Sequence, residues 1–276
     1  MKDGITAARR TVQAAAFAFL HSNVFGSAAL ARFCLPVMNC EACAVAWLGC
    51  PVGMMGRSLV FHEIPWLVLL MVLGLGVLVG RLFCGWVCPM GFLQDLLHMI
   101  PSRKFRLPRW TACIKYGVLA VTVLGVAWFV GTDSPYFYCG FCPTAGIQVV
   151  LPAAIEDIDV SRLTWQPVKM ILVVAVLVSG VFISRSFCKV MCPIGALVAI
   201  TNRLTPFRIK VEGETCVGCK KCDKGCPMDV PVMWHREAGA APVNRDTECI
   251  ECLTCQSACP TNAIGTQVLP KRDGGD

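Results

Sequence analysis

Near the C-terminus one cysteine pattern occurs twice, as Cys216-x2-Cys219-x2-Cys222-x3-Cys226-Pro227 and as Cys249-x2-Cys252-x2-Cys255-x3-Cys259-Pro260. This spacing is typical of bacterial ferredoxins with two [4Fe–4S] clusters, where each cluster takes three thiolates from one run and the fourth from the other. A zinc site would use two pairs of ligands, and disulfide frameworks are typical of small secreted chains. The pattern therefore predicts two clusters with crossed ligand sets, Cys216, Cys219, Cys222 and Cys259 for the first and Cys249, Cys252, Cys255 and Cys226 for the second.

Apolar residues dominate the chain before residue 205. The protein has 276 residues, of which 55% are hydrophobic and 16% are charged. Three apolar stretches, 65–83, 113–130 and 167–187, are each about as long as a bilayer's hydrocarbon core is thick. A fourth stretch, 12–33, is interrupted by polar residues and has a signal peptide as its alternative interpretation. We expect four transmembrane helices.

The distribution of basic residues predicts the orientation of these helices. Connections with few basic residues follow the first and third helices, where only Arg57 and Arg162 occur. The other connections are basic, with Lys2, Arg9, Arg10, Arg103, Lys104, Arg106, Arg109, Lys189, Arg203, Arg208 and Lys210. Both termini and the ferredoxin region are therefore expected in the cytoplasm of a bacterium, with the chain in its inner membrane. The net charge of +7 reflects this topology and indicates no nucleic-acid partner.

The expected fold class is an α-helical membrane protein with a C-terminal α+β ferredoxin domain that holds two [4Fe–4S] clusters. The four transmembrane helices occupy residues 1–205 in two pseudo-repeats, the ferredoxin domain occupies residues 206–266, and residues 267–276 form a disordered tail.

The pseudo-repeat appears as a second cysteine pattern, Phe-Cys-x3-Cys-Pro-x-Gly, which ends the second and fourth apolar stretches. A pseudo-twofold axis along the membrane normal would bring its four cysteines together at the cytoplasmic face. Four converging thiolates would hold a further [4Fe–4S] cluster, whereas packing as small apolar groups is the alternative. The candidate ligands of this inner site are Cys84, Cys88, Cys188 and Cys192.

Further cysteines follow the first and third apolar stretches, on the expected outer side. These residues predict either a fourth cluster or a pair that cycles between dithiol and disulfide. The candidates are Cys40, Cys43, Cys50, Cys139 and Cys142, each near a glycine or proline except Cys43. We expect Cys34 and Cys113 to serve in packing.

The order of these motifs resembles that of the NapH-type membrane ferredoxins. The resemblance rests on Phe83-Cys84-Gly-Trp-Val-Cys88-Pro89, Phe187-Cys188-Lys-Val-Met-Cys192-Pro193 and the two ferredoxin runs, and it covers roughly residues 65–265. It implies four transmembrane helices, cytoplasmic [4Fe–4S] clusters and the oxidation of quinol within a quinol dehydrogenase. The outer cysteines are a departure from the nitrate-pathway members, so the chain is more similar to a broader group of Cys-x3-Cys-Pro membrane ferredoxins.

A quinone site combines an apolar slot with polar hydrogen-bonding groups, and two histidines are candidates for it. His62 lies beside Glu63 before the second apolar stretch, and His98 lies near Asp95 after Cys88. The residues contribute redox centres, and the pattern predicts no catalytic acid or base.

Three functions are compatible with the sequence. The first is an electron conduit between a cytoplasmic partner such as a ferredoxin-like protein or another redox subunit, the quinone pool and a periplasmic acceptor. The second is a maturation factor that reduces thiols or metals through the outer cysteines. The third is a membrane anchor in which only the two clusters of the ferredoxin domain work.

Overall fold

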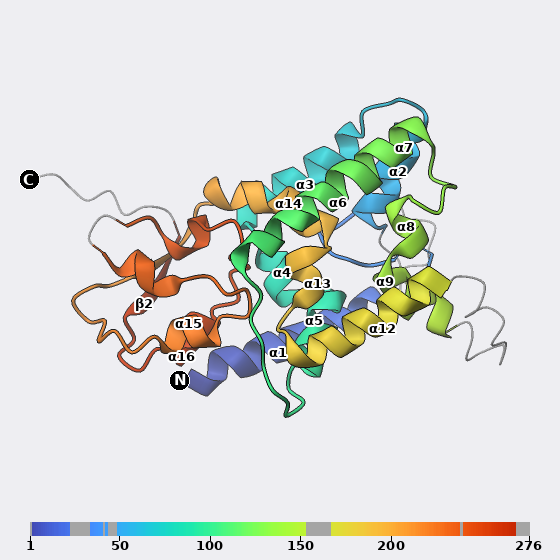
Figure 1. Cartoon of the computed structure of the whole chain (residues 1–276). Coiled ribbons are helices and arrows are strands. Elements are labelled where there is room, and N and C mark those ends of the chain that lie inside the picture. Colours follow the sequence, from blue (N-terminus) through green and yellow to red (C-terminus); the bar gives the residue numbers. More distant parts are fainter. Residues whose placement is uncertain are drawn as a thin grey trace, which may run out of the picture.

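The computed structural model describes residues 2–22, 34–40, 42–43, 49–152, 167–237 and 240–268. Its larger part is a group of helices, and its smaller part is a compact unit with one two-stranded sheet near the C-terminus (Figure 1). We call these parts the helical part and the head. The helical part contains α1 (Lys2–Leu20), α2 (Pro51–Val60), α3 (Trp66–Val79), α4 (Leu82–Trp86), α5 (Pro89–Leu97), η1 (Arg109–Cys113), α6 (Ile114–Val118), η2 (Leu119–Gly125), α7 (Val126–Phe129), α8 (Tyr138–Phe141), α9 (Pro143–Ala145), η3 (Gly146–Val150), α12 (Pro167–Phe182), α13 (Ser186–Val190), α14 (Pro193–Ala199) and η4 (Ile200–Arg203).

One helical segment of the described chain, Arg109–Phe129, is long and apolar enough to cross a membrane, with 21 residues and a mean hydropathy of 1.8. The apolar helices α3 and α12 are shorter than the stretches predicted for them. The backbone turns at Gly80 and at Arg185, both with positive φ, so each apolar helix ends there and a short helix begins. These turns separate the apolar helix from the Cys-x3-Cys-Pro motif that follows it.

The first predicted transmembrane stretch differs from the observed helix. Residues 12–33 were expected to be helical, whereas α1 begins ten residues earlier, at Lys2, and ends at Leu20. Residues 23–33 of the prediction lie outside the described residues. The helix α1 lies against α5 and against α16 (Thr254–Ala258) of the head (Figure 1).

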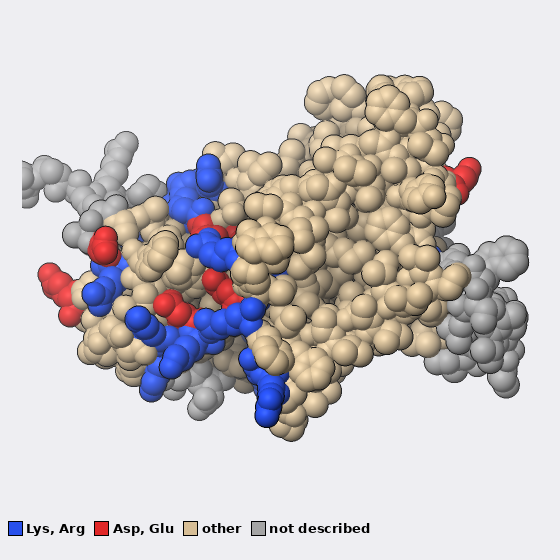
Figure 2. Space-filling view, viewed as in Figure 1, with Lys and Arg blue, Asp and Glu red and all other residues tan. Residues whose placement is uncertain are grey.

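The surface of the helical part is apolar over a broad area. Lys and Arg gather on the head and at its junction with the helical part, and the helices beyond are almost free of charged side chains in this view (Figure 2). Large hydrophobic side chains point outward along three helices, among them Leu70, Leu78, Val121, Ile171 and Val174. Such an area is typical of a surface in contact with lipid.

The head is built on a short antiparallel pair of strands, β1 (Phe207–Val211) and β2 (Ile264–Val268), with Phe207 opposite Val268. Around the pair lie α15 (Lys221–Gly225), η5 (Val232–Arg236), η6 (Val243–Arg245) and α16 (Thr254–Ala258). The strand β2 runs to Val268, so Gln267 and Val268 are not part of a disordered tail as predicted. Pairing with β1 satisfies their backbone groups.

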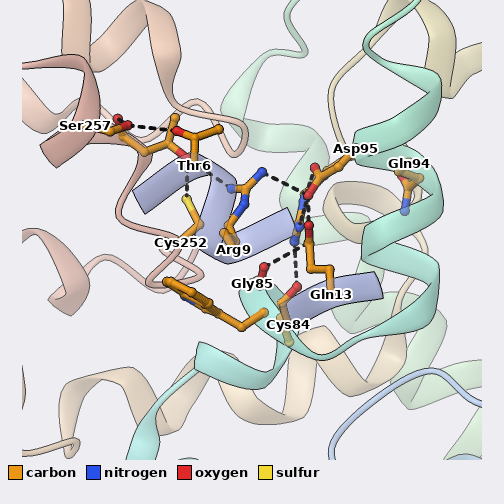
Figure 3. A network of polar contacts seen from close by, with 12 residues as sticks. Thr6, Arg9, Gln13, Cys84, Gly85, Gln94, Asp95, Cys252 and Ser257 are labelled. Carbon is orange, nitrogen blue, oxygen red and sulfur yellow. Dashed lines mark hydrogen bonds and ion pairs between the residues drawn. The ribbon is translucent and has the colours of Figure 1, made fainter. Parts of the chain in front are cut away.

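A network of polar contacts joins α1, the head and the rest of the helical part (Figure 3). Asp95 of α5 accepts hydrogen bonds from Arg9 at 3.1 Å, from Gln13 at 2.9 Å and from two nitrogens of Arg185 at 2.9 and 2.6 Å. Arg9 also donates to Thr254 of the head. One carboxylate therefore holds three segments that are distant in sequence.

Replacement of this carboxylate by an amide will destabilise the protein. In an Asp95→Asn variant the fully buried Arg185 and the largely buried Arg9 lose their compensating charge, which costs about 3–5 kcal/mol. Thermal unfolding in detergent should show a lower melting temperature for this variant than for Asp133→Asn, which changes an exposed carboxylate. Equal melting temperatures for the two variants would contradict the role assigned to Asp95.

Candidate metal centres and the junction between them

The head brings together the four cysteines that the sequence assigns to the first cluster. Cys216, Cys219, Cys222 and Cys259 line one cavity, together with Lys220 and the apolar side chains of Val211 and Ile264. Three of these cysteines come from the first run and the fourth comes from the second.

The remaining four cysteines of the head form a second group. Cys249 interacts electrostatically with Cys252, Cys255 and Cys226, and Cys226 interacts with Cys252. Burial raises the pKa of Cys226 to about 12 and that of Cys249 well above its usual value. Without metal these thiols keep their protons at neutral pH, so iron binds here by replacing protons.

Both runs reach this arrangement through the same backbone. Three positions of the first run have positive φ, Gly218, Lys220 and Asp229, and so do the three positions 33 residues later, Glu251, Leu253 and Asn262. The last cysteine of each run also accepts a backbone hydrogen bond, Cys226 from Val230 at 3.4 Å and Cys259 from Ala263 at 3.3 Å. Backbone donors of this kind stabilise cluster sulfur and raise the reduction potential.

The inner four cysteines also meet in the structure. Cys84, Cys88, Cys188 and Cys192 line a cavity between α4, α5, α13 and α14. Cys88 and Cys192 each precede a proline at the start of a helix, and Cys192 accepts a hydrogen bond from the Gly195 N–H at 3.3 Å. Gln94 donates to the Cys188 sulfur at 3.3 Å.

These groups fit iron–sulfur clusters better than single ions. Among the described residues no three His, Cys, Asp or Glu side chains converge as the ligands of one metal ion would. The four thiolates of a [4Fe–4S] cluster bind four separate iron atoms and therefore surround a volume. Two groups of four cysteines, each lining a cavity, have this form.

Two buried arginines beside the inner site were missed by our sequence analysis. Arg81 and Arg185 are 1% and 0% exposed, and each lies three residues before the first cysteine of its motif. Their contacts are reciprocal: Arg81 reaches Gly195 of the second repeat, and Arg185 reaches Gly91 of the first. The repeated Arg-x-Phe-Cys spacing was the signal that could have identified them. Each guanidinium places a positive charge beside thiolates that would be anionic when they bind iron.

The first inner motif lies directly on the second cluster run of the head. A Cβ on Gly85 would come within 2.4 Å of the Ile250 carbonyl oxygen and 3.4 Å of the Cys252 Cα, so only glycine permits this approach. The neighbouring Trp86 indole donates to the Glu251 carbonyl oxygen at 3.1 Å. The inner site is therefore in contact with the second cysteine group of the head.

Ion pairs reinforce this junction from several sides. Lys115 of α6 donates to both oxygens of Glu248 at 2.5 and 2.6 Å, and Lys189 pairs with Asp229 at 2.5 Å. Arg109 pairs with Asp246 at 2.5 Å. Basic residues that we used to predict the topology thus also bind the acidic residues of the head.

Glu251 lies at the same junction, between two cysteines of the second run. It is 1% exposed and accepts a hydrogen bond from Asn244 at 3.0 Å. Burial raises the pKa of its carboxyl to about 7, and Asn244 and Arg81 oppose that rise. The residue is also close to Gly80, where a Cβ would meet its carboxylate at 2.7 Å.

The outer cysteines lie inside the helical part. Cys50 interacts electrostatically with Cys139 and Cys142. The Cys40 backbone N–H donates to the Gln148 side chain at 2.7 Å, and Cys43 is buried. Cys34 is buried against Met71, as expected for a packing role, whereas Cys113 is exposed, contrary to expectation.

The two histidines considered for quinone occupy different places. His98, together with Asp95, lines a cavity of about 550 Å³ beside Cys226 and Pro227 of the head. Its walls combine apolar side chains with Arg9 and Lys104. Burial and the Lys104 ammonium lower the pKa of His98, so its ring is neutral at pH 7. His62 is exposed and packs edge-on against Trp128.

Comparisons with known families agree with these groupings. The family described as "4Fe-4S binding domain" matches residues 64–108 and again residues 165–212, which contain the two inner motifs. The family described as "4Fe-4S dicluster domain" matches residues 215–264. The chain therefore carries [4Fe–4S] domains. No solved structure matches the chain.

Several known proteins are similar along most of the chain. YccM of Escherichia coli, named as a candidate electron transport protein, is 28% identical over 218 residues, which cover 76% of this chain and 57% of YccM. The ferredoxin-type protein NapH of Haemophilus influenzae is 25% identical over 243 residues, 81% of this chain and 71% of NapH. The methylamine utilization ferredoxin-type protein MauN of Methylobacillus flagellatus is 26% identical over 152 residues, 54% of this chain and 48% of MauN. The expected resemblance to ferredoxin-type membrane proteins is confirmed.

The prediction that each head cluster takes its fourth ligand from the other run can be tested. A Cys226→Ser variant, although it changes the first run, should lose the second cluster and keep the first, with a loss of about four iron atoms per chain. Iron analysis and electron paramagnetic resonance of anaerobically purified protein measure this. Cys113→Ser, at an exposed cysteine far from both runs in sequence, should keep its full iron content. Loss of the first cluster in place of the second would show that each run binds its own cluster.

Proposed function

We propose that this chain, a relative of the ferredoxin-type membrane proteins, is an iron–sulfur electron conduit of the bacterial inner membrane. The head exchanges electrons with a cytoplasmic partner or a neighbouring redox subunit. The second head cluster passes them to or from a third [4Fe–4S] cluster held by Cys84, Cys88, Cys188 and Cys192. Quinone exchanges electrons at the second head cluster, and from the inner cluster electrons pass to or from an acceptor on the other side of the membrane.

The observation that carries this proposal is the contact at Gly85. The backbone of the first inner motif touches the second cluster run, and Cys84 and Cys188 border the buried core of the head. An electron that leaves the second cluster therefore has a path through packed protein, without crossing water. A membrane anchor with no redox role would not need its cysteine motif at this position.

Four membrane crossings with both termini in the cytoplasm are part of the proposal. The helical segment Arg109–Phe129, the apolar helices α3 and α12, and their outward-facing hydrophobic side chains support it. The fourth crossing would include α1. Basic residues on the head side of these helices agree with a cytoplasmic head.

The chemistry of the clusters is one-electron transfer, and the residues around them set the potentials. Arg81 and Arg185 stabilise negative charge at the inner site, and the Gln94 amide donates to one of its sulfurs. Each of these interactions favours the reduced state, which carries one more negative charge. The inner site is thus suited to accept electrons from the head.

Quinone binding is supported by the cavity beside α5. His98 and Asp95 supply polar groups, Phe92 and Leu96 supply apolar walls, and the cavity adjoins Cys226 of the second cluster. We assign the quinone role to His98, which lines this cavity, and not to His62, which is exposed.

Thiol reduction as the alternative function has less support. A periplasmic protein substrate must reach the sulfur atoms, but three of the five outer cysteines, Cys43, Cys50 and Cys142, are buried, and only Cys40 and Cys139 are partly exposed. Reactive thiols are partly exposed as a rule.

The junction can be tested by adding one methyl group. Gly85→Ala places a Cβ against the Ile250 carbonyl, and relief of this overlap costs about 1–3 kcal/mol of docking energy. We expect slower reduction of the inner cluster when electrons enter through the head. Rapid-freeze electron paramagnetic resonance measures this rate. Gly74→Ala, where a Cβ meets no atom within 4 Å, is the matched control. Equal rates in both variants, with equal iron content, would remove the support for this path.

The quinone assignment is tested by two histidine variants. His98→Ala should raise the quinol concentration needed for half-maximal reduction of the clusters, since a hydrogen bond to quinone is worth about 1 kcal/mol or more. His62→Ala should behave as the unchanged protein. If instead His62→Ala raises this concentration and His98→Ala does not, the quinone site lies at the end of α2.

A further inference from the structure

Cys50 and Cys142 occupy the same kind of turn as the inner cysteines. Each is the residue before a helix that begins with proline, as are Cys88 and Cys192. Their backbone angles are alike, with φ and ψ of −78° and 125° at Cys50, −62° and 119° at Cys142, −63° and 120° at Cys88, and −74° and 109° at Cys192. The backbone N–H groups of Gly53 and Ala145 point at the sulfurs of Cys50 and Cys142. The outer cysteines thus have the form of the inner ligands.

The outer cysteines are also assembled around one place. Cys50 is within electrostatic range of Cys139 and Cys142, although α2 and α9 are about ninety residues apart in sequence. Cys40 is fixed to the same region by its hydrogen bond to Gln148, which follows Cys142 in η3. The segment that contains Cys40 is irregular and buried, which in a membrane protein is tolerated where protein or a bound group covers it.

A buried lysine lies close to the outer cysteines. Lys169 of α12 is 7% exposed, packs close to Gly146 and interacts with Cys142. Arg81 and Arg185 have the same relation to the inner cysteines. A buried cation beside buried thiols is stabilised when the thiols bind iron as anions.

Tyr138 links the two groups of cysteines. Its side chain is fully buried, and its hydroxyl has no hydrogen-bond partner in the part of the chain that the structure describes. The hydroxyl is within electrostatic range of Cys50, Cys139 and Cys142, and also of Cys192 of the inner site. A buried hydroxyl donor without an acceptor is costly, so the unpartnered hydroxyl in this region indicates an acceptor bound there.

We infer that Cys40, Cys50, Cys139 and Cys142 hold a fourth [4Fe–4S] cluster, and that Tyr138, located between this cluster and the inner one, donates a hydrogen bond to its sulfur. The transfer step moves one electron from the inner cluster to this cluster, with no covalent bond made or broken. The electron is supplied by the head, so the inference rests on the proposed conduit. The conduit thereby gains a defined exit for electrons and a residue, Tyr138, that sets the reduction potential of the fourth cluster.

Iron content tests the cluster. Protein purified without oxygen should contain about 16 iron atoms per chain, and Cys50→Ser, Cys142→Ser and Cys40→Ser should each lose about four of them. Cys43→Ser, in the same segment, should keep its iron. About 12 iron atoms in the unchanged protein, with no loss in these variants, would overturn the fourth cluster. Loss in Cys43→Ser but not in Cys40→Ser would overturn the ligand assignment.

A redox titration tests Tyr138. Removal of a hydrogen bond to an anionic cluster disfavours reduction, so Tyr138→Phe should lower the reduced-to-oxidised ratio of one cluster roughly tenfold at a fixed potential. Tyr136→Phe, two residues away and exposed, should leave all clusters unchanged. An unchanged titration of Tyr138→Phe with full iron content would overturn its role.

The proposed conduit fails in a different way. It fails if electrons from the head do not reach the inner cluster, whatever the iron count on the outer side. A protein with 12 iron atoms and fast reduction of the inner cluster would therefore reject the fourth cluster and keep the conduit.

Discussion

The compensation of buried charge is the constraint on which the rest of this structure depends. Two guanidinium groups, of Arg81 and Arg185, are withdrawn from water beside four cysteines, and a charge in such a place is tolerated only with close partners. Asp95 supplies the partner of Arg185, and Glu248 of the head lies 3.8 Å from Arg81. Each half of the pseudo-repeat therefore depends on a carboxylate from outside it. Glu248 of the head thus balances the charge of Arg81, and Asp95 of α5 balances that of Arg185.

This requirement also breaks the pseudo-symmetry of the two repeats. Gln94 and Asp95 follow Cys88 and contact Cys188 and Arg185, whereas the second repeat has Val198 and Ala199 at the corresponding positions. The apolar pair packs in the core, and the polar pair is opposite α1. The two halves can thus share one backbone design while only one of them binds the N-terminal helix.

The sequence was sufficient for features that depend on local spacing. Short repeats led to the groups of four cysteines that the structure brings together at one cavity of the head and at the inner site. The crossed cluster ligands and the four membrane crossings stay predictions. The ends of the helices did not follow from the sequence, because the predicted apolar stretches run through the turns at Gly80 and Arg185 to the cysteine motifs. Arg81 and Arg185 were missed, since only the fold shows that each reaches the other repeat. The placement of α1 was also hidden, because its partners lie more than seventy residues away.

The exposure of the cysteines indicates where electrons enter in the proposed conduit. Cys219 of the first cluster group is exposed at the far side of the head, with the exposed Lys220 and Lys221 beside it. The second group contacts the inner site through Gly85, and the inner site lies near Tyr138 and the outer cysteines. In the proposed conduit a partner therefore approaches the first group most directly, and the lysines favour a partner with an acidic surface.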